Sequence, residues 1–149
     1  MLPFKGIEYA ESLSAIHAKC FEKPWSLKNF QEILNLPNTF GFCTQEGFIL
    51  CADLGEDIEI LTFAVLPEYH RKGIGTSLLT ALQNFAIQQK KKHIFLEVKA
   101  TNIAAKSLYL KNEFIQTGLR KNYYHEQGKS FDALCLTWQN PQLKARDSV

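Results

Sequence analysis

The stretch Tyr69-His70-Arg71-Lys72-Gly73-Ile74-Gly75-Thr76 lies between a segment of strand character and a segment of helical character. Upstream, residues 58–66 are rich in β-branched and apolar side chains and are followed by Pro67, a pattern typical of a buried strand. Downstream, apolar residues recur at helical spacing over residues 75–89. A glycine-containing loop that joins a strand to a helix gathers unpaired backbone N–H groups at the positive end of the helix dipole. Such a loop favours a phosphate or pyrophosphate group.

The side chains of the loop agree with this interpretation. Arg71 and Lys72 add positive charge, and Gly73 and Gly75 allow a ligand to approach the backbone closely. The chain has no G-x-x-x-x-G-K-S/T loop, and Leu78 stands where the dinucleotide-binding pattern G-x-G-x-x-G needs its third glycine. Two interpretations remain: an anion site for another class of cofactor, and an ordinary helix start beside a solvated basic pair.

The composition indicates one soluble domain. A chain of 149 residues, 46% hydrophobic and 21% charged, is long enough for one substantial core. The formal charge of +2 is too small to indicate nucleic-acid binding. The four cysteines form no C-x-x-C pair and have no metal-ligand spacing with the histidines, which predicts reduced thiols in a cytoplasmic protein without a metal site. Neither a signal peptide nor a membrane span is expected.

Periodicity and turn residues predict the order α-α-β-β-β-α-β-α-β-β. The predicted helices cover residues 8–21, 26–35, 75–89 and 101–111. The predicted strands cover residues 40–44, 48–53, 58–66, 93–99, 114–121 and 130–138. This order predicts a single α/β domain over residues 1–139, with a mixed sheet and helices on both faces. Residues 140–149 are predicted to be a mobile tail, and the basic run 90–92 a solvated helix end.

The predicted strand His93-Ile94-Phe95-Leu96-Glu97-Val98-Lys99 carries a second group of functional interest. Alternation places Glu97 on one face with Phe95 and Lys99, and the aliphatic residues on the other. A carboxylate within an apolar run is partly desolvated, which favours proton uptake and suits a general base. The alternative is a structural carboxylate paired with Lys99 or with another basic neighbour.

The next predicted helix begins at a capping residue, either Thr101 or Asn102. Tyr109 lies seven residues past Asn102 and therefore projects from nearly the same helical face. Its phenol could donate a proton toward the N-terminal side of this helix. Alternatively, Tyr109 is a core aromatic residue with a hydrogen-bonded hydroxyl.

Taken together, residues 58–138 resemble the catalytic half of the GNAT superfamily of acetyl-CoA-dependent N-acetyltransferases. The fingerprint of that superfamily is a strand, a Q/R-x-x-G-x-G/A loop and a helix, and the loop here is His70-Arg71-Lys72-Gly73-Ile74-Gly75. Within the superfamily the chain resembles the RimI family, which acetylates the N-terminal alanine of a small-subunit ribosomal protein. The residues that carry this resemblance are Leu96-Glu97-Val98-Lys99-Ala100-Thr101-Asn102-Ile103-Ala104-Ala105, Leu108-Tyr109, Leu119-Arg120-Lys121-Asn122-Tyr123-Tyr124 and, at the start of the second helix, Pro24-Trp25-Ser26. It covers about residues 10 to 138 and implies a GNAT fold with a mostly antiparallel sheet.

The resemblance implies that acetyl-CoA is the co-substrate and that no metal is needed. By position, the backbone of Phe63-Ala64-Val65 would pair with the pantetheine arm. The loop Arg71-Lys72-Gly73-Ile74-Gly75-Thr76 would hold the pyrophosphate through its N–H groups. Asn102 would contact the end of the pantetheine, and the N–H of Val65 would stabilise the oxyanion.

The resemblance also implies the catalytic roles. Glu97 matches the family's proton acceptor and Tyr109 its proton donor to the leaving thiolate, while Tyr123 and Tyr124 fall in the region that lines the peptide slot. The implied partner is the N-terminus of a ribosomal protein, without nucleic-acid or membrane contact, and the implied enzyme is a cytoplasmic monomer. Two other functions stay open: acetylation of a small-molecule amine, and acyl-CoA sensing without catalysis. Retention of both Glu97 and Tyr109 argues against the sensor.

Three positions depart from the family pattern. His70 stands where Gln or Arg is usual, which puts one side-chain contact to the cofactor in question. Glu113 replaces a glycine, which predicts a local cost of about 1 kcal/mol unless Asn112 takes the left-handed conformation. His125 is either a second candidate base or a polar loop residue.

Overall fold

The computed structural model describes residues 1–143, and its elements follow the predicted order. The helices are α1 (Ala10–Cys20), α2 (Leu27–Leu34), α3 (Ile74–Gln88) and α4 (Ile103–Lys111), with short 3-10 helices η1 (Ile7–Tyr9) and η2 (Pro67–Tyr69). The strands are β1 (Thr39–Cys43), β2 (Gly47–Asp53), β3 (Asp57–Val65), β4 (His93–Lys99), β5 (Ile115–Glu126) and β6 (Lys129–Gln139). The largest difference is in β5, which continues to Glu126 instead of ending at residue 121. An irregular segment interrupts its pairing with β6 but does not end it.

The six strands form one sheet in the order β1-β2-β3-β4-β6-β5. Only β3 and β4 run parallel, and the other neighbouring pairs in the described chain are antiparallel. A parallel pair needs a long crossover, which α3 supplies, whereas the antiparallel neighbours β1–β2, β2–β3 and β5–β6 need only turns. The predicted mixed, mostly antiparallel α/β fold is therefore confirmed. No helix of the described chain is long and apolar enough to cross a membrane.

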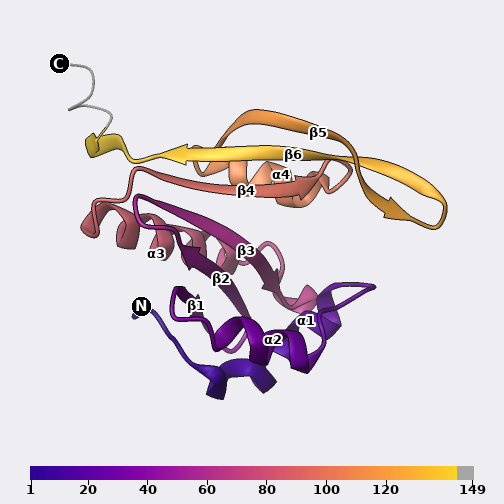
Figure 1. Ribbon diagram of the computed structural model, residues 1–149, viewed down its shortest axis with the longest axis horizontal. Coiled ribbons are helices and arrows are strands. Elements are labelled where there is room, and N and C mark those ends of the chain that lie inside the picture. Colours follow the sequence, from indigo (N-terminus) through magenta and orange to yellow (C-terminus); the bar gives the residue numbers. More distant parts are fainter. Residues whose placement is uncertain (144–149) are drawn as a thin grey trace.

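Helices cover both faces of the sheet (Figure 1). Along β2, Phe48 and Leu50 pack with α1 and α2, whereas Ile49 and Cys51 pack with α3. Because β2 is buried on both faces, its sequence is a nearly continuous apolar run rather than an alternating one. Full burial of each large apolar side chain contributes about 1.5–3 kcal/mol, so these two clusters hold the layers together.

Local signals start and end the helices where the sequence predicts. Ser26 caps α2 by accepting a hydrogen bond from the Asn29 N–H at 3.1 Å. Asn102, and not Thr101, caps α4, because its side chain accepts from the Ala105 N–H at 3.2 Å. After α4, Glu113 takes the left-handed conformation with φ 71°, so the missing glycine does cost about 1 kcal/mol at this position.

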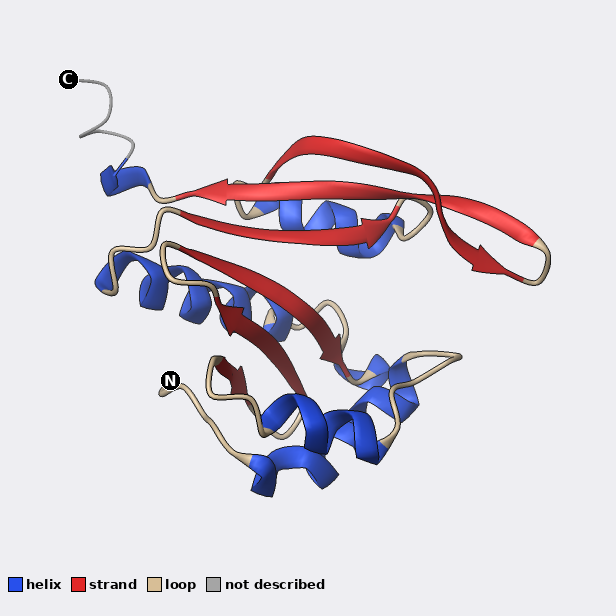
Figure 2. Cartoon of the chain, viewed as in Figure 1, coloured by secondary structure: helices blue, strands red, loops and turns tan. Residues whose placement is uncertain are grey.

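The strands β3 and β4 are paired at one end only. Their register joins Asp57 to His93, Ile58 to Ile94 and Glu59 to Phe95, and no further pairs follow. Just beyond, Leu61 has no partner in β2, because Ile60 pairs with Cys51 and Thr62 with Leu50. Such a bulge bends its strand and turns it away from its neighbour. Figure 2 shows β4, β5 and β6 running together while β3 diverges from β4 toward its C-terminal end.

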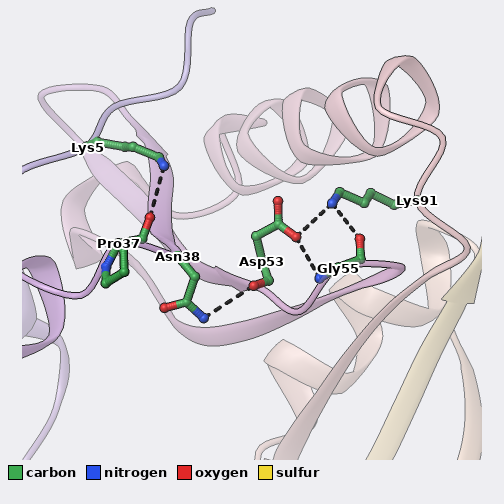
Figure 3. Close-up of polar contacts among 6 residues, drawn as sticks. All are labelled: Lys5, Pro37, Asn38, Asp53, Gly55 and Lys91. Carbon is green, nitrogen blue, oxygen red and sulfur yellow. Dashed lines mark hydrogen bonds and ion pairs between the residues drawn. The ribbon is translucent and has the colours of Figure 1, made fainter.

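The paired end is held by a polar network that the sequence did not predict (Figure 3). Lys91, expected as part of a solvated helix end, has a side chain only 12% exposed. It donates to Asp53 Oδ1 at 2.7 Å and to the Gly55 carbonyl at 2.6 Å. Burial alone would raise the pKa of Asp53, but the hydrogen bonds from Lys91 and Gly55 and the charges of Lys91 and Lys5 hold it below its usual value.

The predicted mobile tail is wrong at its first residue, Asn140. Asn140 is 1% exposed, and its side chain donates to the Lys91 carbonyl at 2.8 Å. Its N–H donates to the Lys92 carbonyl at 2.9 Å, so the segment after β6 closes onto the turn between α3 and β4. Polarity alone predicted a tail, but a polar side chain can be buried when its hydrogen bonds are satisfied. Residues 144–149 of the predicted tail lie outside the described residues.

Candidate active site

The loop between β3 and α3 presents free backbone donors. Gly73 caps α3 with φ 82°, and Arg71 is also left-handed with φ 64°. The first helical bond comes from the Ser77 N–H to the Gly73 carbonyl, and no N–H from 71 to 76 donates to another backbone group of the described chain. A Cβ at Gly73 would meet nothing within 4 Å. The loop therefore offers an open set of N–H groups at a helix start, which fits a pyrophosphate.

Gly75 has a packing role in this structure. A Cβ at this position would lie 3.1 Å from Leu108 Cδ2 and 3.7 Å from the Phe63 ring. The glycine thus lets the start of α3 approach α4 and β3 closely. The sequence assigned Gly75 to ligand approach, and this close packing is a second reason for a glycine there.

His70 ties the loop to the end of β3. Its Nε2 lies 2.7 Å from the Val65 carbonyl, which also accepts from Cys20 Sγ at 3.3 Å. Because a carbonyl only accepts, Nε2 of His70 carries the proton. The Leu66 N–H bonds to Glu46 on the β2 side, so strand alternation turns the Val65 N–H away from β2 and toward the divergence. His70 therefore holds the strand that would present this N–H.

Glu97 lies on β4 beyond the last pair with β3. The predicted alternation is confirmed, since Ile94, Leu96 and Val98 are buried and Glu97 is on the other face, with a side chain 29% exposed. Its Oε1 lies 3.1 Å from Arg120 Nε, so the carboxylate is paired with a basic neighbour. That neighbour is not Lys99, which lies 2.7 Å from Glu126.

Tyr109 lies inside the larger core cluster and is 5% exposed. Its ring meets the rings of Phe63 and Phe114 edge-on, with centroids 6.0 Å and 5.4 Å away. Burial, with a smaller effect from Cys51, raises the pKa of the Tyr109 phenol. The hydroxyl therefore stays protonated at neutral pH, as a proton donor requires.

Tyr123 and Tyr124 lie at the irregular segment of β5. Register is lost between Arg120 and Tyr124, where Asn122 has φ 54° and its N–H donates to Asp132 Oδ1 at 3.0 Å. Burial, and next the charge of Glu97, raises the pKa of Tyr124. Tyr123 packs edge-on against Tyr124, with centroids 5.3 Å apart.

His125 is exposed on the same hairpin, and its Nδ1 lies 3.2 Å from Ser130 Oγ. This contact joins neighbouring strands of the hairpin. Among residues 1–143 no group of three or more His, Cys, Asp or Glu side chains could hold a metal ion.

No role was predicted for His17 from the sequence, although this side chain supports the other side of β3. It is 2% exposed and surrounded by the rings of Phe21, Trp25, Phe30 and Phe48. Its Nδ1 accepts from the Trp25 N–H, and its Nε2 lies 3.1 Å from Thr62 Oγ1, just after the bulge. Desolvation by burial lowers its pKa to about 4, so the ring is neutral at pH 7. A lone histidine in an apolar helix gives no local signal of these contacts.

Comparison with known proteins places this geometry among acetyltransferases. Residues 10–114 match the acetyltransferase (GNAT) family. The ribosomal protein bS18-alanine N-acetyltransferase of Escherichia coli K12 is 30% identical over 122 residues, covering 76% of this chain and 79% of its own. The crystal structure of the ribosomal-protein-S18-alanine N-acetyltransferase from Escherichia coli matches with a TM-score of 0.83 at 24% identity, over 93% of this chain and 92% of that one. Arabidopsis thaliana NAA60 in complex with acetyl-CoA matches with a TM-score of 0.76 at 19% identity, over 93% and 97%.

Proposed function

The chain belongs to the GNAT acetyltransferase family, and we propose that it acetylates the N-terminal α-amine of a protein with acetyl-CoA as the donor. Its relatives at about 30% identity are N-acetyltransferases named for the alanine of ribosomal protein bS18. We therefore propose a small-subunit ribosomal protein that begins with alanine as the acceptor. The observation that supports the proposal is that β3 and β4 pair only at residues 57–59 and 93–95, which leaves Glu97 and the loop after β3 beyond the paired end.

Acetyl-CoA would lie along the diverged part of β3. Phe63-Ala64-Val65 has no partner strand on the β4 side, so its outward backbone groups are available to the amides of the pantetheine arm. The loop Arg71 to Thr76 would hold the pyrophosphate through its N–H groups. Asn102, whose Oδ1 caps α4, keeps its amide nitrogen for the end of the pantetheine.

The proposed reaction uses Glu97 and Tyr109 as base and acid. An α-ammonium group has a pKa near 8 and must lose a proton before it attacks, and Glu97 takes this proton. The neutral nitrogen then bonds to the thioester carbon, and the Val65 N–H stabilises the oxyanion. As the C–S bond breaks, Tyr109 donates its proton to the thiolate. The nitrogen loses a second proton to restore the phenol, so one proton leaves with the thiol and one goes to solvent.

The acceptor would enter past the irregular segment of β5. Tyr123 and Tyr124, at this segment of β5, would flank the first residues of the peptide. Aromatic side chains with polar tips suit an extended backbone, because they supply contact area and a hydrogen-bonding hydroxyl together.

The test is thiol release. The protein is incubated with acetyl-CoA and a peptide beginning Ala-Arg, and free thiol is followed together with the mass of the peptide. We expect peptide-dependent thiol and one added acetyl group on the α-amine. A matched peptide with a blocked N-terminus and a free lysine separates α-amine from side-chain acetylation. Thiol release with a small amine but not with the peptide would overturn the proposal.

A further inference from the structure

Glu97 has a positively charged partner within the chain. Arg120 Nε lies 3.1 Å from Glu97 Oε1, and the two side chains are 56% and 29% exposed. Lys99, on the same face, is engaged elsewhere, because its Nζ lies 2.7 Å from Glu126 Oε2 and 3.9 Å from the centroid of the Phe131 ring. Within residues 1–143, Arg120 is therefore the cation that neutralises Glu97.

The sheet gives Arg120 a clear route to Glu97. The two residues lie on β5 and β4, with β6 between them, and the residues of β6 on this path are Ala133 and Cys135. Gly118 of β5 stands opposite Cys135 and has no side chain. A Cβ at Gly118 would already lie 3.3 Å from Cys135 Cβ. Small residues thus let the long arginine side chain cross β6 and reach the carboxylate.

Arg120 makes a second favourable contact in the same conformation. Its guanidinium carbon lies 5.1 Å from the centroid of the Tyr123 ring. A guanidinium over an exposed aromatic ring gains about 0.5–1 kcal/mol from cation–π attraction. The bulge that carries Tyr123 is held by the hydrogen bond from Asn122 to Asp132, so the ring stays beside Arg120. Arg120 can therefore leave the carboxylate without losing all of its stabilising contacts.

We propose that Arg120 is a positioning residue that takes the place of the substrate ammonium on Glu97 in the free enzyme. When the acceptor binds, its N-terminal ammonium replaces the guanidinium, which moves fully onto Tyr123. The exchange keeps the carboxylate paired and oriented throughout, and it removes the arginine before the proton is transferred. This inference rests on the proposed function, because it takes Glu97 as the base and an ammonium as the incoming group.

The test separates KM from kcat in Arg120→Met, with acetyl-CoA and the Ala-Arg peptide. Removing the competing cation is expected to lower the KM for the peptide about 3-fold to 5-fold, the value of one exposed ion pair. The kcat is expected to change by less than about 2-fold, because the guanidinium has already left Glu97 when the proton is transferred. The KM for acetyl-CoA stays unchanged. Arg120→Lys, which keeps a competing cation, should bring the KM for the peptide back toward that of the unaltered protein.

Matched variants decide the result. Lys121→Met removes the same charge one residue away, where no ion pair exists within the described residues, and should leave the peptide KM unchanged. In a Glu97→Gln background, Arg120→Met should no longer lower the peptide KM. An unchanged or raised peptide KM in both Arg120→Met and Arg120→Gln, or an equal fall in Lys121→Met, overturns the inference. Absence of peptide acetylation by the unaltered protein would instead overturn the proposed function.

Discussion

The two ends of the β3–β4 pair are built differently. At one end, residues 57–59 pair with 93–95, and the largely buried Lys91 joins the turn before β4 to the turn before β3 through Asp53 and Gly55 (Figure 3). At the other end, beyond the bulge at Leu61, the strands separate.

This difference shows how one sheet combines stability with an open site. Hydrogen-bonded strands satisfy each other's backbone groups, so a ligand cannot use them. Where β3 and β4 part, the same groups become available, and Glu97 lies on β4 beyond its last pair with β3. We therefore expect substitutions at the paired end to change stability, and substitutions at the diverged end to change activity.

The largest effect is expected at Glu97. Glu97→Gln keeps the shape of the side chain but removes the proposed base, and should lower kcat/KM for the peptide about 1,000-fold. The free energy of unfolding should change by less than about 0.5 kcal/mol, since the pair with Arg120 is partly exposed. Steady-state kinetics and urea denaturation measure the two quantities. Glu126→Gln, which breaks the neighbouring pair with Lys99, is the control, and equal losses in both variants would contradict the assignment of the base.

His17 should make the diverged end sensitive to mild acid. Its pKa is lowered from 6.5 to about 4, so the unfolded chain binds the proton more strongly. The contribution of His17 to the free energy of unfolding should be fully present above pH 6.5. It should fall by roughly 3 kcal/mol as the pH drops to 4 and level off below that pH. Urea denaturation at pH 7, 5.5 and 4 measures the fall. His17→Phe should flatten the curve over this window, and parallel curves for both proteins would refute the prediction.

Lys91→Met should lower stability and leave activity unchanged, whereas Glu97→Gln should lower activity and leave stability nearly unchanged. It removes the Lys91 donor from the Asp53 carboxylate and the Gly55 carbonyl and should lower the free energy of unfolding by about 2 kcal/mol, with kcat/KM unchanged. Because the pKa of Asp53 is held low, its contribution is present above the ordinary carboxyl pKa and is lost as pH falls through the lowered value. In Lys91→Met this loss of stability in acid moves to higher pH.

Lys92→Met is the control, because it breaks an exposed pair with Glu56 and should cost less than about 0.5 kcal/mol. A cost equal to that of Lys91→Met would contradict the difference in burial.

The smallest effects are expected at two glycines that have free space around them. Gly73 lies at the diverged end and Gly55 at the paired end. Gly73 and Gly55 have φ 82° and 94°, and a Cβ would meet nothing at either position. Replacement by alanine should cost about 1 kcal/mol in each case, because only the backbone is strained. At Gly73 the strain should also raise the KM for acetyl-CoA about 5-fold, whereas Gly55→Ala leaves it unchanged. Equal KM values in both variants would separate the loop from the cofactor.

Several features could be predicted from the sequence because they depend on nearby residues. Apolar spacing predicted α1 to α4 and β1 to β6 in order, but not the short η1 and η2. Ser26 was recognisable as a capping residue, and Asn102 as one of two candidates. The loop after β3 was predicted from two glycines before an amphipathic segment. Glu97 was recognised as a candidate functional residue because it is one carboxylate in an alternating apolar strand. The family resemblance assigned roles to these positions, and the roles remain proposals.

Other features arise only from contacts between distant segments. The partner of Glu97 is 23 positions away on β5, and local spacing favoured Lys99, two residues along the same strand. The burial of Lys91 depends on Asp53 and Gly55 in another turn, and the proximity of Gly75 to Leu108 depends on how α3 meets α4. Periodicity reports which face of an element is apolar, but not what lies opposite it. The sequence by itself thus determined the elements, the position of the glycine-containing loop before α3 and the placement of Glu97 on its strand. The tertiary structure alone decided the divergence of β3 and β4 and the pairing of Glu97 with Arg120, because both depend on the register of strands that are remote in the chain.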